Sequence, residues 1–149
     1  MSTKFFTDKL VNTLTMLTER VDEVEPKLPD PLPVDAEDRI IVYEGVLDVI
    51  EPAIGELTRG LEDQRQLTYE FRSYVLSIKN DTIRDAAELE FAAISNTHAT
   101  NATLVAARTR RRDLVKLRAD ILVMIYSFYL KGFLSHIATS KQGTCDIGL

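Results

Sequence analysis

The sequence predicts an all-α protein, an antiparallel bundle of three to four helices with long, partly coiled-coil-like helices. Apolar residues recur at alternating spacings of three and four along most of the chain, which is the period of one helix face. No segment sustains the period-two alternation of a half-buried strand. Four of the five prolines lie together within residues 26–33, which leaves long stretches on both sides for helices.

The first predicted helix runs from about Thr3 to Val24, within an N-terminal segment 1–25. Its apolar residues form a single stripe with a heptad period, made of Leu10, Leu14, Leu17, Val21 and Val24. The prolines that follow remove amide donors and disfavour helical angles in the residues before them. We therefore expect residues 26–35 to be an extended, Pro-rich connector.

The main helical hairpin or bundle is expected over residues 36–139. Asp35 is a plausible N-cap for a long helix over about 36–79. Its stripe begins at Tyr43 and continues with the same spacing to Ile78. Pro52 lies inside this pattern and should kink or break the helix, because proline removes one backbone hydrogen bond.

A turn is expected at 79–82, with Asn80 in left-handed angles and a capping pair of Thr82 and Asp85 opening the next helix at about Ile83. Residues 95–103 are rich in Ser, Asn and Thr, which are poor residues for the interior of a helix. We expect either a loop here or the middle of one very long helix. A last helix is expected over about 104–139, followed by a flexible tail over 140–149.

Composition narrows the function classes. The length of 149 residues fits a single helical domain, 1–149. The net charge of −5 makes general nucleic-acid binding unlikely, since that affinity comes from neutralising phosphates. Cys145 has no partner for an intrachain disulfide. The opening residues do not resemble a secretory signal, so we expect a cytoplasmic, intracellular location with membrane association as an alternative.

Recognised reaction centres are missing from the sequence. It holds two histidines and one cysteine, and neither His98 nor His136 follows a glutamate at the Glu-x-x-His spacing. The segment Gly55–Glu62 resembles the start of a phosphate-binding loop, but Leu61 and Glu62 replace the lysine and hydroxyl. We therefore expect no enzyme, and no catalytic, metal or cofactor site.

A basic patch interrupts the otherwise acidic chain. We interpret it first as an electrostatic partner of the acidic stretch Glu19–Asp38, since blocks of opposite charge in one compact chain usually meet. A contact with phosphate or lipid headgroups is the alternative. The patch comprises Arg108, Arg110, Arg111, Arg112, Lys116 and Arg118.

The most informative stretch is Ile121–Ala138, which is apolar on nearly every helical face and has Lys131 as its only formal charge. Such a helix belongs in a bundle core, a subunit interface or lipid. Its length falls slightly short of the roughly 20 apolar residues of a spanning helix. We expect a core or interface, with a membrane anchor as the alternative. The interface candidates are Tyr126, Phe128, Tyr129, Phe133 and Leu134.

These features predict a non-enzymatic structural or assembly protein that acts through helix–helix contacts with a protein partner or in a homo-oligomer. It would be a repeated subunit of a larger complex, because the predicted apolar stripes exceed what one short bundle covers. The alternative is a membrane-associated helical subunit anchored by residues 121–138 beside the basic patch.

Overall fold

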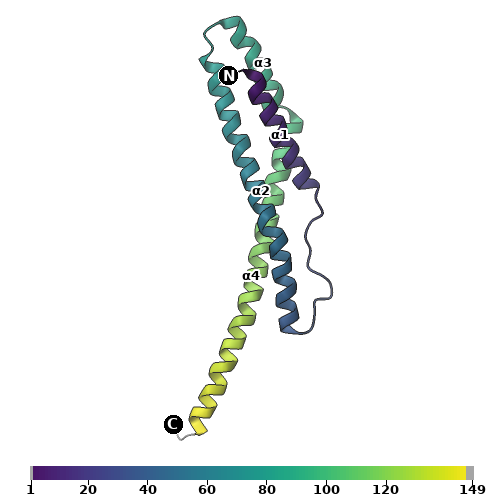
Figure 1. Cartoon of the computed structure of the whole chain (residues 1–149), viewed down its shortest axis with the longest axis vertical. Coiled ribbons are helices and arrows are strands. Elements are labelled where there is room, and N and C mark those ends of the chain that lie inside the picture. The colour runs from purple at the N-terminus through teal and green to yellow at the C-terminus, as the bar shows by residue number, and fades with distance from the viewer. Residues whose placement is uncertain (1, 147–149) are drawn as a thin grey trace. The chain divides into compact units, whose positions relative to one another are not determined.

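The computed structural model describes the backbone of residues 2–146 and the side chains of residues 2–138, and it confirms the all-α helical bundle (Figure 1). Four helices follow one another along the chain: α1 (Thr3–Asp22), α2 (Ala36–Ser77), α3 (Asp81–Ser95) and α4 (His98–Asp146). No strand occurs within residues 2–146. Residues 23–35 form the connector expected from the prolines.

Two of the helices differ from the prediction, α2 in its continuity and α4 in its length. α2 passes through Pro52 without a break, because the proline lies between the buried residues Ile50 and Ile54, whose packing outweighs one missing hydrogen bond. α4 continues to Asp146, where the sequence predicts a tail from residue 140. The Cys145 side chain and the backbone of residues 147–149 lie outside the described residues.

The start of α3 also corrects the prediction. Asn80 is the N-cap, with an extended backbone at φ −75° and ψ 120°, and its side-chain oxygen accepts a hydrogen bond from the Ile83 amide. The helix therefore begins at Asp81, two positions earlier than expected from a Thr82 cap. Asn80 does not need left-handed angles because its side chain satisfies an otherwise free amide of the first turn.

The polar stretch 95–103 contains a break of two residues, Asn96 and Thr97, and then continues as helix. Thr97 caps α4, because its hydroxyl accepts from the Thr100 amide at 3.1 Å. The Thr100 hydroxyl in turn donates to the carbonyl of Ile94 in the last turn of α3, at 2.8 Å. Thr97 and Thr100 therefore supply the hydrogen bonds of this junction.

The chain divides into two compact units, each built from two separate stretches of sequence. Unit 1 comprises Met1–Glu25 and Glu51–Leu114, and unit 2 comprises Pro26–Ile50 and Val115–Leu149. The long helices α2 and α4 each contribute to both units. The sequence does not predict this division, because their apolar stripes run on without a change of composition.

Unit 1 holds most of the buried side chains. In it, α3 turns back after α2 and α1 lies alongside (Figure 1). Phe6 of α1 stacks on Phe71 of α2, and Phe91 of α3 meets Phe71 edge-on at 5.2 Å between ring centroids. The α1 stripe also packs through Leu10 and Leu17, whereas the predicted stripe residue Val24 lies beyond the helix and is 94% exposed.

Unit 2 has a smaller core between the first part of α2 and the second part of α4. Tyr43 and Ile50 of α2 are buried, as are Ile121 and Ile125 of α4. The ring of Tyr43 lies 6.2 Å from that of Phe128. In the connector, the Pro33 carbonyl accepts a hydrogen bond from Arg39 Nε, next to the start of α2. Two packed helices cover one side of each other, so the remaining sides face solvent.

Candidate interaction surface on α4

An exposed apolar stripe runs along the second part of α4. It consists of residues spaced alternately by three and four positions, and we call it the α4 stripe: Val123, Tyr126, Leu130, Phe133 and Ile137. The first four are exposed by 62, 67, 56 and 60%, and Ile137 is half-buried. Tyr129 and Leu134 flank the stripe and are exposed by 58 and 54%.

Helix geometry places this stripe opposite the face that packs in unit 2. Each residue turns an α-helix by 100°, so Ile121, Ile125 and Phe128 share one face and Tyr126, Leu130 and Phe133 share the other. The first face contacts α2 through Phe128 and Tyr43. The second face carries side chains of the same apolar character without a covering helix within unit 2.

Four of the five interface candidates named from the sequence lie on this outward side: Tyr126, Tyr129, Phe133 and Leu134. Phe128 does not, because its half-buried ring packs against Tyr43. Val123 and Leu130 belong to the exposed stripe but were not among the candidates. Their heptad spacing with Tyr126 and Phe133 is the sequence signal that identifies them.

The same part of α4 is long and apolar enough to cross a membrane, judged by length and composition alone. Within the described helix His98–Ala138, an 18-residue window has a mean hydropathy of 1.5, and 11% of it is buried. A segment that formed the internal core of unit 2 would be mostly buried. Ile121 and Ile125 are buried in unit 2, whereas most of the window is exposed, so the segment is only partly a core helix.

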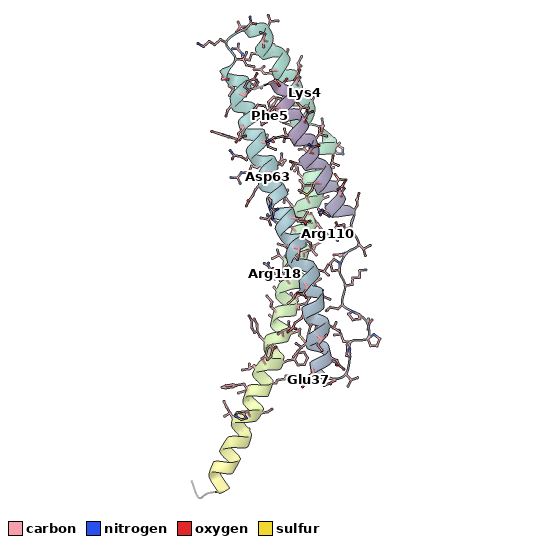
Figure 2. The ribbon with its side chains drawn as sticks, viewed as in Figure 1. Lys4, Phe5, Glu37, Asp63, Arg110 and Arg118 are labelled. Atoms are coloured by element: carbon pink, nitrogen blue, oxygen red, sulfur yellow. The ribbon has the colours of Figure 1, made fainter. Side chains whose placement is uncertain are left out.

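The basic patch begins in unit 1, where it meets the end of α1. Arg110 donates a hydrogen bond to the backbone carbonyl of Glu23 at 3.0 Å, and Figure 2 shows it beside the C-terminal end of α1. Arg111 is half-buried and Arg108 is exposed. The expected contact with the acidic stretch is thus formed at one arginine, through a carbonyl that terminates a helix rather than through a carboxylate.

Arg20, rather than an arginine of the basic patch, forms ion pairs with carboxylates near the end of α1. Arg20 of α1 forms ion pairs with Glu23 and with Glu56 of α2, the latter at 2.6 Å from Nε to Oε2. The hydrogen bond and charge of Glu23, with the charge of Glu56, raise the pKa of Arg20 above its ordinary value. The Glu23 carboxylate thus pairs with Arg20 while the Glu23 carbonyl binds Arg110, an arrangement that charge counting along the sequence does not reveal.

The other residues of the patch differ in their exposure. Arg112 has a 76% exposed side chain and lies 3.8 Å from Asp113. In unit 2, Lys116 is exposed and Arg118 is half-buried. These charges precede the α4 stripe on the same helix.

No protein-family model, curated protein or solved structure matches this chain. The arguments for its function therefore rest on its own surface.

The grooves of unit 1 are weaker candidates for a binding site than the α4 stripe. One of them, with a volume of about 590 Å³, lies between α2 and α3 and is open to solvent. Its rim carries Arg65 and Arg72 together with Glu88, so it presents no consistent charge to a ligand. Among the described residues, no three His, Cys, Asp or Glu side chains gather in a way that could hold a metal ion.

Proposed function

We propose that this chain is a non-enzymatic structural or assembly protein that acts through helix–helix contacts, as a repeated subunit of a larger complex. The observation that carries the proposal is the α4 stripe, whose first four side chains are all more than half exposed. Contiguous apolar surface of this kind is uncommon on soluble monomers and marks sites where another molecule binds.

The spacing of the stripe favours a helix as the binding element. Alternating steps of three and four residues keep a seam facing one partner helix, as in a coiled coil. The aromatic residues Tyr126 and Phe133 are suited to an interface because they bury a large area at little cost in side-chain entropy. A coiled-coil-like pairing through α4 is therefore the contact that we propose.

Light scattering on a size-exclusion column, with the chain purified without detergent, tests the proposal. We expect a discrete oligomer, and we expect Leu130→Glu to dissociate it by placing a charge in the seam. Leu89→Glu is the matched control, because Leu89 of α3 is 74% exposed and lies outside the stripe. A wild-type chain that remains a monomer would contradict the proposal.

A second candidate function is membrane association through residues 121–138. The mean hydropathy of 1.5 over the exposed window favours it, and so do the arginines that precede the window, since basic residues beside an apolar segment bind anionic lipid. Flotation with vesicles containing phosphatidylserine tests it. Recovery of the wild-type chain only in detergent, with flotation lost in Arg110→Glu/Arg111→Glu/Arg112→Glu, would favour this candidate over assembly.

A further inference from the structure

We infer that the partner of the α4 stripe is a second copy of this chain, bound so that the two α4 helices run antiparallel. The inference rests on the proposed function, because it names the partner and the geometry of the same surface. It draws on three properties of the described residues: the exposed area, the charge beside the stripe, and the position of the basic patch along α4.

The exposed area is large enough for a symmetric interface. The side chains of Tyr126, Tyr129 and Phe133 are exposed by 67, 58 and 60%. At about 200 Å² for an aromatic side chain, they leave roughly 370 Å² uncovered in each copy. With the aliphatic residues Val123, Leu130 and Leu134, two copies would bury on the order of 1,000 Å² or more, which is the size that stable interfaces reach.

The positions that flank the stripe carry no charge that would repel an identical helix. In a coiled coil, the residues on both sides of the seam meet their counterparts on the partner and decide which partner is accepted. Charged residues there would favour a partner of opposite charge. The flanking positions are instead Leu122, Ser127, Tyr129, Leu134 and His136. A second copy of α4 can therefore pack against this surface, because no partner with flanking residues of opposite charge is required.

The basic patch selects the antiparallel orientation. In a parallel pair, residues Arg108–Arg118 of both copies would lie side by side, and like charges at that distance repel. In an antiparallel pair centred near Phe128, Arg112 of the two copies would be on the order of 50 Å apart, well beyond the screening length. The same register places Val123 against Phe133 and Tyr126 against Leu130, so each ring meets a smaller aliphatic side chain.

Disulfide crosslinking in the full chain tests this geometry, in a Cys145→Ser background so that the introduced thiols are the only ones. Opposed seam positions bring Cα atoms within the range of about 4.4–6.8 Å that a disulfide spans. Val123→Cys and Phe133→Cys chains, mixed before oxidation, should form the mixed disulfide dimer. Each variant oxidised alone should give at least tenfold less dimer. Circular dichroism and light scattering before oxidation verify that both variants are folded and associated.

The outcomes separate the two proposals. A mixed disulfide between oligomeric chains supports the antiparallel pair. Efficient crosslinking of Val123→Cys with itself in a chain that is oligomeric would overturn the antiparallel geometry and leave the assembly function standing. An oligomer without any crosslink would overturn the α4 pairing. A chain that stays monomeric would overturn the assembly function as well.

A second measurement does not depend on cysteine substitution. Tyr126→Ala should weaken dimerisation by about 30-fold or more, as expected for an aromatic anchor in a helix seam. Tyr69→Ala is the matched control, because Tyr69 of α2 is 68% exposed, nearly the same as the 67% of Tyr126, and lies outside the stripe. Equal effects of the two substitutions in sedimentation equilibrium would overturn the inference.

Discussion

Phe6 of α1 and Phe71 of α2 stack with their ring centroids 5.1 Å apart and their planes at 14°. Both side chains are almost fully buried, at 1 and 0% exposure. Phe91 closes the same cluster from α3 through its edge-on contact with Phe71. A single side chain thus joins three helices of unit 1, which makes Phe71 the centre of its core.

We predict that Phe71→Ala lowers the free energy of unfolding by about 3–5 kcal/mol, through lost burial and the cavity left behind. Urea denaturation followed by circular dichroism measures the change. Tyr69→Ala, two positions earlier on the exposed side of α2, should change the value by less than about 0.5 kcal/mol. Similar losses for both variants would show that the cluster around Phe71 does not stabilise the fold in particular.

Gly60 of α2 lies against the side chains of Met16 and Leu17 of α1. A Cβ atom at Gly60 would lie 2.5 Å from Met16 Cε and 2.7 Å from Leu17 Cδ2, and Leu17 is fully buried. We predict that Gly60→Ala destabilises the chain by about 1–2 kcal/mol, because the crowding exceeds the gain of roughly 1 kcal/mol in helix propensity.

Gly55 provides the opposite case in the same helix. Nothing lies within 4 Å of a Cβ atom placed there, so Gly55→Ala should stabilise the chain by about 0.5–1 kcal/mol. Thermal unfolding of the two variants compares them directly. Stabilisation by Gly60→Ala would contradict this prediction. It would mean that the side chains of Met16 and Leu17 move aside without a cost in free energy, and that the packing of α1 on α2 does not require a small residue at position 60.

Thr100 provides the hydrogen bonds that hold the junction of α3 and α4. It is 7% exposed, and its hydroxyl donates to the Ile94 carbonyl at 2.8 Å. Thr100→Val keeps the shape and leaves that carbonyl without its donor, so we predict a loss of about 1–3 kcal/mol. Thr103→Val, which removes a hydroxyl bond on an exposed turn, should cost less than half as much in the same urea titration.

The ion pair of Arg20 and Glu56 should respond to salt rather than to pH. Because the Glu23 hydrogen bond and charge, followed by the charge of Glu56, raise the pKa of Arg20, the stability that this shift contributes is present at neutral pH and is lost only as strongly alkaline pH passes through the raised pKa. We predict that Glu56→Gln lowers the Tm by a few degrees at low ionic strength, and that molar salt removes the difference. Glu62→Gln, also on α2, is the control and should leave the Tm unchanged in both buffers.

The sequence predicts the positions of the helices better than their division into two compact units. The stripe predicted for α2 is buried at Tyr43, Ile50, Phe71 and Val75, and even the polar Gln64 within it is 8% exposed. Periodicity predicts this because burial of one helix face follows from the spacing of apolar residues. Capping was less predictable, since Asn80 and Thr82 are both suitable caps and the choice depends on where the preceding turn ends.

The surface on α4 was partly predictable. The apolar character of residues 121–138 marks the segment, and its aromatic residues supply three of the side chains that are exposed, Tyr126, Tyr129 and Phe133. The sequence could not say which side of the helix faces α2, because nearly every side is apolar. The contact between Phe128 and Tyr43 fixes that rotation. Val123 and Leu130 then follow as members of the outward stripe.

The packing of α1 also sets the order of events while the chain is being made. Phe6 is translated before Phe71 and Phe91, aromatic residues of the same cluster. At about 5–20 residues per second, the apolar face of α1 waits for several seconds before its docking site exists. An isolated helix of 20 residues is only marginally stable in water. Docking of α1 therefore has to follow the synthesis of the parts of α2 and α3 that contact it.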